Sequence, residues 1–216
     1  DCMDFAKEAE ALTRRLVKTA SINGTAGEAD IADAIYGYFA ALPYFQAHPE
    51  NLWTVSLTGD KLQRKNVFAL VRGVKTGNAK TVILHGHTDT VGVEDFGALA
   101  PWAFDAELLE ERLRTRPLPA DAAADLDSGN WLFGRGALDM KSGVAVHMTV
   151  IKALSENCGN LEGNVLFMAN PVEENYTKKE VYIPMRDGTK LFTIIYIPKD
   201  ISKNNKYPFI MNRTCY

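Results

Sequence analysis

Hydrophobic residues recur at helical spacing through the first forty residues and predict two amphipathic helices. The first lies between residues 3 and 20, among charged residues, and ends near residues 21–24. Thr25 and Glu28 have the spacing of a capping box, which predicts the start of the second helix. The apolar faces are Phe5, Leu12, Leu16 and Val17 in the first helix, and Ile31, Ile35, Tyr38, Phe39 and Leu42 in the second, before Pro43.

Shorter runs of β-type residues follow, at residues 53–57, 66–71 and 81–84. The run at 82–84 is apolar throughout, which predicts a strand in the interior of a sheet. It ends at His85-Gly86-His87-Thr88-Asp89-Thr90, and open α/β sheets place their ligand-binding crevices at such strand ends. A buried helix at 143–155 and an apolar strand at 164–169 complete the pattern. The sequence therefore predicts an α/β fold.

Composition restricts the class of protein further. The chain has 216 residues, of which 46% are hydrophobic, and a formal net charge of −3. This composition predicts a globular protein with a core and excludes a disordered chain, a collagen and a coiled coil. Because no apolar run approaches the roughly 20 residues of a membrane helix, we expect no membrane span. The first four residues lack the features of a secretory signal, so a cytoplasmic location is predicted. Because the net charge is negative, we expect no nucleic-acid partner.

The three cysteines, Cys2, Cys158 and Cys215, form no C-x-x-C pair. They therefore indicate neither a disulfide framework nor a thiolate zinc site, and we expect reduced thiols.

Charge and alanine content change near residue 175. Residues 1–175 carry a net charge of −8 and 25 alanines, whereas residues 176–216 carry +5 and no alanine. A β-rich segment would by itself lose alanine and gain β-branched residues. The alternative is that two unrelated pieces are joined here, with domains at residues 1–175 and 176–216.

Three strand or loop ends offer imidazole and carboxylate groups: His87 with Asp89, Asp139, and the pair Glu173-Glu174. Histidine nitrogen and carboxylate oxygen are the ligands of zinc sites that keep a position open for water. Each piece also has a structural explanation. The histidine can bond a neighbouring carboxylate, Asp139 can belong to a turn between glycines, and the glutamates can be a solvated surface.

The order of these segments resembles a known family. Residues 84–91, 134–143 and 173–174 are similar to the successive metal-site motifs of the dizinc hydrolases, which include aminoacylases, succinyl-diaminopimelate desuccinylase, peptidase T and glutamate carboxypeptidase. Residues 42–45, 91–97 and 131–136 are similar to the arginine-utilization branch. The resemblance covers about residues 4–175.

The resemblance implies a role for each matching residue. His87 resembles a ligand of one zinc ion, and Asp89 resembles the catalytic-site carboxylate that orients the His87 imidazole. Asp139 resembles the carboxylate that bridges two zinc ions. Glu173 resembles the general base, and Glu174 resembles a ligand of the zinc ion that does not carry His87. The implied activity is zinc-assisted hydrolysis of an amide bond. No family role falls on His85.

The sequence also departs from the family. Val172 stands where an aspartate usually precedes the glutamate pair. All four histidines precede residue 148, so residues 148–216 cannot supply the further histidine ligand that the family uses. There is no room for the inserted lid domain. We therefore expect a truncated zinc-peptidase-like catalytic domain, with a mixed sheet flanked by helices and an incomplete site for the two zinc ions, followed by a short β-rich tail.

The tail has a resemblance of its own. Residues 176–191 predict a hairpin turning at Arg186-Asp187-Gly188, and residues 192–197 and 207–211 predict further strands. This pattern resembles the N-terminal strands of the cocaine-esterase and X-prolyl dipeptidyl-peptidase group of α/β-hydrolases. In that resemblance Tyr216 matches an oxyanion-hole tyrosine, and Cys215 replaces the usual proline before it. No G-x-S-x-G motif occurs.

These observations leave three hypotheses. The first is a zinc-dependent amidohydrolase or peptidase acting on acylated amino acids or small peptides. The second is an inactive chimeric fragment that binds metal weakly, and the third is the N-terminal piece of a serine esterase or dipeptidyl peptidase. In each case the chain alone is expected to show little or no turnover, and uncovered strand edges predict self-association.

Overall fold

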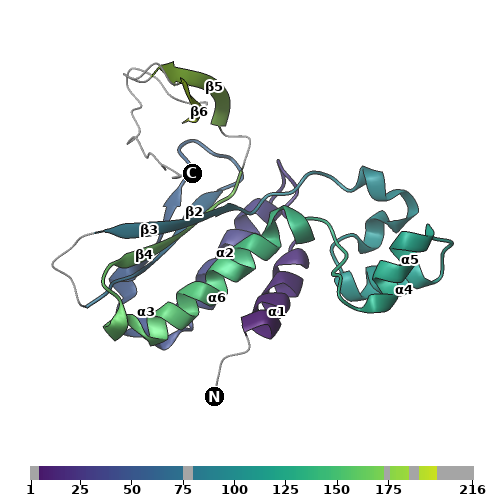
Figure 1. Ribbon diagram of the computed structural model, residues 1–216, viewed down its shortest axis with the longest axis horizontal. Helices are drawn as coiled ribbons and strands as arrows, with labels where there is room; N and C mark the ends of the chain where they lie inside the picture. The colour runs from purple at the N-terminus through teal and green to yellow at the C-terminus, as the bar shows by residue number, and fades with distance from the viewer. Residues whose placement is uncertain (1–4, 75–79, 173–175, 185–189, 199–216) are drawn as a thin grey trace. The chain divides into compact units, whose positions relative to one another are not determined.

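The structure is a computed structural model that describes residues 5–74, 80–172, 176–184 and 190–198. The chain divides into two compact units, residues 1–172 and residues 173–216. Unit 1 contains a four-stranded sheet in the order β1-β2-β4-β3, with strands Leu52–Ser56, Lys65–Val71, Asn164–Asn170 and Thr81–His87 respectively. β2 is antiparallel to β1 and β4, whereas β3 runs parallel to β4. The predicted mixed sheet flanked by helices is confirmed (Figure 1).

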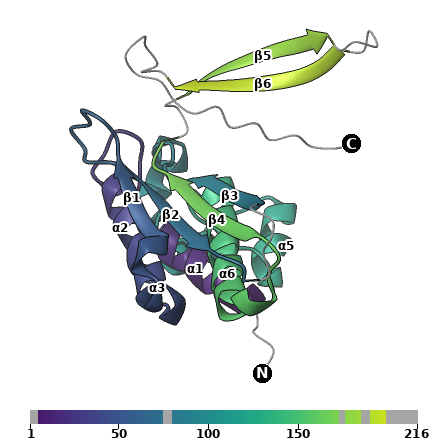
Figure 2. The same cartoon turned by 90° about the vertical axis from the view of Figure 1, so that its left-hand side faces the viewer.

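Helices cover one face of this sheet, as Figure 2 shows from the side of the strands. They are α1 (Phe5–Val17), α2 (Gly27–Ala40) and α6 (Ser142–Glu156). On the face of β2 that packs against these helices, Val67, Ala69 and Val71 are buried. Phe39 of α2 packs edge-on against Phe167 of β4, with ring centroids 5.0 Å apart. The core thus lies between the sheet and the predicted apolar helix faces, where burial of each large side chain contributes roughly 1.5–3 kcal/mol.

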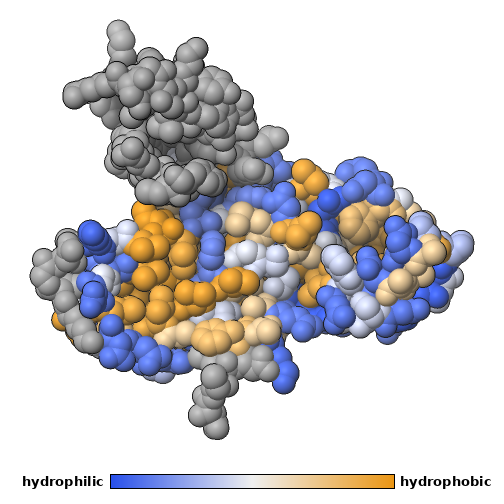
Figure 3. All heavy atoms as spheres, viewed as in Figure 1, coloured by the Kyte–Doolittle hydropathy of each residue, from blue (hydrophilic) through white to orange (hydrophobic). Residues whose placement is uncertain are grey.

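The edge position of β3 contradicts the predicted interior strand. Among the described residues β3 pairs with β4 alone, and Val82 and Ile83 are 59% and 41% exposed. An apolar run shows that a segment is suited to burial on both faces, but it does not determine how many neighbours the strand has. Val146 of α6 is also exposed, at 49%. Figure 3 shows an apolar patch over the region where Figure 1 places β3 and α6.

The predicted capping box of α2 is wrong. The Thr25 hydroxyl donates to the Ile22 carbonyl instead of accepting from the Glu28 amide, and the residue before the helix is Ala26. The Glu28 carboxylate does reach back, but it accepts from the amide of Gly24 at 2.7 Å. The helix begins after Ala26, so Thr25 stands one residue before the position from which a side chain caps a helix. Pro43 ends the predicted face of α2 and begins the short helix α3 (Pro43–Ala47), where its missing amide costs nothing.

A helical excursion separates β3 from the loop before α6. Its elements are η2 (Glu94–Trp102), α4 (Ala106–Arg114) and α5 (Ala120–Ser128), and the short turn η3 (Ala137–Lys141) then leads into α6. Asp105 caps α4 by accepting from the amide of Leu108 at 3.1 Å. Two single-turn elements, η1 (Pro49–Asn51) and η4 (Cys158–Asn160), precede β1 and β4. Of the helices that the structure describes, none is long and apolar enough to cross a membrane.

Unit 2 contains an antiparallel pair of strands, β5 (Tyr176–Pro184) and β6 (Lys190–Pro198). The pairing agrees with the predicted hairpin, but the second strand extends to Pro198 and includes the run at 192–197. The predicted turn at 186–188 and the strand at 207–211 lie outside the described residues, as do Glu173, Glu174, Cys215 and Tyr216.

Candidate metal centre

His87 is the last residue of β3 and lies opposite Asn170 in β4. Its side chain is only 12% exposed. Its Nδ1 lies 3.1 Å from Oδ1 of Asp89, and its Nε2 lies 3.0 Å from Oδ1 of Asp139. One ring nitrogen therefore faces the buried carboxylate and the other faces the exposed one. Sequence reasoning placed these three residues together, and the structure brings them together.

The segment that follows His87 is fixed from the side of β4. The amide and the hydroxyl of Thr88 both donate to the carbonyl of Asn170, at 2.9 and 3.2 Å. Oδ1 of Asn170 accepts from Nε2 of His85 across 2.6 Å, and Nδ2 of Asn170 donates to the carbonyl of Val172. Asn170 thus joins β3 to the chain just before the glutamate pair. The sequence showed it only as a strand end, because its role depends on contacts with residues 82 to 85 positions away.

His85, which matched no family role, is therefore a bonding partner of Asn170. Burial lowers the pKa of His85, and the hydrogen bond to Asn170 partly opposes that effect. The Gly86 between the two histidines has a clear steric reason. A side chain there would begin 2.9 Å from Cγ2 of Val144, where β3 packs against α6.

Asp139 stands in η3, on a loop that needs glycine. Gly136 has a φ of +77°, and a Cβ atom on it would lie 2.6 Å from Cγ2 of Thr90. The Asp139–Met140 peptide bond is cis. The Asp139 side chain is 81% exposed, in contrast to the 7% of Asp89. The predicted glycine-bracketed loop thus presents Asp139 to solvent beside His87, whose side chain is far less exposed.

Lys141 anchors this loop to the segment that carries Thr19. Its role was not predicted from the sequence. Its side chain is fully buried, its Nζ donates to the carbonyl of Thr19 at 2.7 Å, and it lies over the ring of Phe104. Burial lowers its pKa to about 7. The Lys-Ser-Gly sequence after Asp139 gave no signal of this contact, since Thr19 is 122 positions away in the chain.

The donor set is consistent with a divalent metal. An imidazole nitrogen and a carboxylate oxygen lie 3.0 Å apart, and a second carboxylate lies behind the ring, where it would fix the imidazole orientation. Within the described part of the chain, no group of three or more histidine, cysteine, aspartate or glutamate side chains is arranged to hold a metal ion. Glu173 and Glu174 are outside that part, so their placement stays a prediction.

Comparison with known proteins now assigns the class. Residues 83–194, just over half of the chain, match peptidase family M20/M25/M40, and the chain therefore belongs to this family. The match includes the strand carrying His87, the loop carrying Asp139 and the glutamate pair. It also extends past residue 175 through β5 into β6. The resemblance of the tail to serine hydrolases remains a prediction.

Two curated relatives come from Bacillus subtilis (strain 168). Protein RocB is 47% identical over 173 residues, which are 80% of this chain and 30% of RocB. The uncharacterized protein YqjN is 38% identical over 166 residues, which are 76% of this chain and 29% of YqjN. The chain thus spans less than a third of the length of these relatives.

A solved structure shows the same fold at low identity. The structure of the dipeptidase Dug1p from Saccharomyces cerevisiae superimposes with a TM-score of 0.51 at 14% identity, over 79% of this chain and 33% of that one. At this identity the likeness concerns the fold alone. It agrees with the α/β architecture of unit 1.

Proposed function

We propose that this chain supplies part of the active site of a zinc-dependent hydrolase that cleaves amide bonds in acylated amino acids or small peptides. The observation that carries the proposal is His87, held between Asp89 and Asp139 at 3.1 and 3.0 Å in a chain of the M20/M25/M40 family. His87, Asp139 and Glu174 would be ligands, and the family resemblance assigns two zinc ions to the complete site.

The residues of the chain would divide the work as follows. Asp89 accepts from Nδ1 of His87, which fixes the ring and leaves Nε2 directed to the metal side. Glu173 would accept a proton from the attacking water and return it to the leaving amine. Zinc bound at this site would supply Lewis acidity toward the amide carbonyl. His87 and the buried Asp89 would stay in place during the reaction, because neighbouring segments hold their backbone.

The substrate is expected to be a small molecule. Within the proposed class we place the arginine-utilization branch first, and the 47% identity with Protein RocB supports this choice. Location in the cytoplasm is part of the same proposal.

The test is hydrolysis of a panel of N-acylated amino acids and dipeptides by the chain, and by a longer chain matching the full length of the relatives, with zinc added after chelation. We expect zinc-dependent hydrolysis in the longer chain and weak or no hydrolysis in the 216-residue chain. The change Glu173→Ala should abolish hydrolysis, whereas Glu162→Ala, at an exposed glutamate before β4, should leave it unchanged. Hydrolysis that survives Glu173→Ala would remove the assigned base.

A second candidate function is weak metal binding without turnover. The 81% exposure of Asp139 favours it, because a metal there would keep much of its contact with water. Calorimetry with zinc, combined with the hydrolysis panel, separates the two candidates. Zinc binding with no hydrolysis in either chain length would favour the second.

A further inference from the structure

Residues 21–24 form a short segment, here called the strap, that lies beside the loop after His87. Ile22 forms an isolated parallel β-bridge with Thr90. The amide of Thr90 donates to the carbonyl of Ser21, and the amide of Asn23 donates to the carbonyl of Thr90, each at 2.8 Å. The buried Ser21 hydroxyl donates to the carbonyl of Thr88 at 2.6 Å. The strap therefore pairs with the loop like an additional strand.

The strap also contacts the carboxylate behind His87. Nδ2 of Asn23 donates to Oδ2 of Asp89 at 3.1 Å, while Oδ1 of Asp89 faces Nδ1 of His87 at the same distance. The two oxygens of Asp89 thus have different partners, one from the strap and one from β3. A carboxylate held at both oxygens can no longer rotate about its terminal bond, so its lone pairs stay directed at the imidazole.

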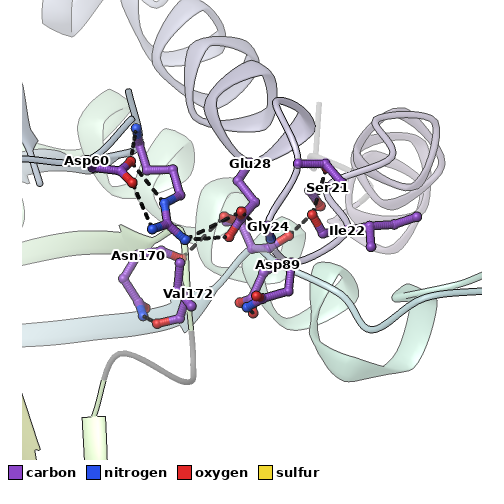
Figure 4. Close-up of polar contacts among 12 residues, drawn as sticks. Ser21, Ile22, Gly24, Glu28, Asp60, Asp89, Asn170 and Val172 are labelled. Atoms are coloured by element: carbon purple, nitrogen blue, oxygen red, sulfur yellow. Dashed lines mark hydrogen bonds and ion pairs between the residues drawn. The ribbon is translucent and has the colours of Figure 1, made fainter. Parts of the chain in front are cut away.

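The strap is anchored on its far side by a buried ion pair. The Gly24 amide donates to the fully buried carboxylate of Glu28. Arg64 approaches Glu28 within 3.4 Å and bonds Asp60 at 2.8 Å, so the two acids hold the guanidinium between them. In Figure 4, Glu28 lies between Asp60 and Gly24, and Asp89 lies beside the strap. These contacts fix the strap to α2 and to the loop before β2.

We infer that Asn23 is a positioning residue of the metal site, which acts through Asp89 to set the orientation and tautomer of His87. The inference rests on the proposed function, because it assumes that Nε2 of His87 is the metal-binding nitrogen. Neutral histidine carries its proton on one ring nitrogen only. Asn23 keeps an oxygen of Asp89 directed at Nδ1, and this favours the Nδ1–H form, in which Nε2 can bind a metal.

The experiment compares Asn23→Ala and Asn23→Asp with Thr25→Ala in the full 216-residue chain. Thr25 is a matched control because it lies two residues further on, is exposed like Asn23, and directs its hydroxyl to the carbonyl of Ile22 instead of to Asp89. Nitrogen NMR of the imidazoles, in zinc-free protein carrying Asp139→Ala, reports the His87 tautomer without competition from the second carboxylate. Calorimetry with zinc, in chains that retain Asp139, reports affinity.

With Asn23 present, we expect His87 mainly in the Nδ1–H form. Asn23→Ala should increase the Nε2–H form several-fold and weaken zinc binding about tenfold, the lower end of the range for such supporting residues. Asn23→Asp keeps the size of the side chain but opposes two carboxylates, and it should do at least as much. Thr25→Ala should change neither quantity.

An unchanged tautomer ratio in both Asn23 variants would overturn the inference. The same holds if Thr25→Ala produces an equal change, because the effect would then be structural. Because the tautomer is measured without zinc, it tests the inference even if the chain with Asn23 binds no zinc. Absence of zinc binding in the chain with Asn23 would instead count against the proposed function.

Discussion

The segment carrying His87 and the loop carrying Asp139 are built in different ways. His87 and Asp89 are 12% and 7% exposed, and the backbone after them is held by Asn170 on one side and by the strap on the other. Asp139 is 81% exposed and stands on a loop with a left-handed glycine. Its main fixed point is the buried Lys141, two residues further on.

This difference separates two tasks of a metal site. The histidine side is preorganised, so the free energy for ordering the ring is provided by folding rather than by the metal. The exposed carboxylate can adjust when an ion arrives. We therefore expect changes in the anchoring of the strap to affect stability and His87 together, whereas changes near Asp139 affect a smaller region.

The largest effect is expected from Arg64→Met. It leaves Glu28 fully buried without its cation, and removal of one partner of a buried pair costs about 3–5 kcal/mol. The value here should be at the lower end, because the Arg64 side chain is 18% exposed. Urea unfolding measures the loss. Arg114→Met, which removes an arginine paired with acids at the surface, is the control and should cost about 1 kcal/mol or less.

We also expect the effect of Arg64→Met on stability to depend on pH. Burial raises the pKa of Glu28, and the hydrogen bond from the Gly24 amide and the charge of Arg64 lower it in part. The folded chain therefore holds this proton more tightly than the unfolded chain, so the stability contribution falls as pH rises from the unfolded pKa, about 4.3, through the folded one. Arg64→Met should raise the pKa of Glu28 further and so extend that fall to higher pH. The double variant with Glu28→Gln should remove it, and a persistent slope would exclude Glu28 as the cause.

Gly136→Ala should have the next largest effect. It forces an L-residue into positive φ and places a methyl group 2.6 Å from Cγ2 of Thr90, for an expected cost of about 1–3 kcal/mol. Gly129→Ala is the matched control, because Gly129 also has positive φ but open space around it. The difference between the two losses in unfolding free energy measures the cost of the clash between the added methyl group and Thr90. Equal losses would mean that this clash is relieved without cost.

Val82→Lys should change stability least and association most. Val82 is exposed on the edge strand β3, and charge on an edge opposes pairing with another chain. We expect the unsubstituted chain to form larger species in sedimentation velocity and Val82→Lys to shift it toward monomer. Val55→Lys, on the opposite edge strand β1, tests the other edge, and a shift in this variant as well would mean that both edges take part. A monodisperse monomer before substitution would refute the predicted self-association.

The local pattern of hydrophobic residues predicted much of unit 1, but it failed where the structure of a segment depends on the segment beside it. The apolar runs gave α6 and β4 close to their observed bounds, because their burial follows from their own residues. The same kind of run misplaced β3 in the sheet interior, since pairing is a property of two segments. Thr25 and Glu28 have the spacing of a cap, but the turn that Thr25 makes with Ile22 moves the start of the helix one residue further, to Ala26.

The candidate site divides in the same way. His87, Asp89 and Asp139 were predicted through family resemblance, and the structure places them within hydrogen-bonding distance. Asn23, Asn170 and Lys141 were missed, because each acts on residues at least 66 positions away. Such contacts leave no periodicity or spacing in the sequence. The supporting residues of a site are therefore harder to predict than the residues that they support.

Calorimetric titration of the chain with zinc tests the central claim most directly, when the unsubstituted protein is compared with His87→Ala, Asp139→Ala and His48→Ala. His48 is an exposed histidine outside the candidate site and controls for adventitious binding. We predict binding heat in the unsubstituted protein and in His48→Ala, a large loss of affinity in His87→Ala and a smaller loss in Asp139→Ala. Absence of binding in the unsubstituted protein, or equal binding in His87→Ala and His48→Ala, would contradict the account.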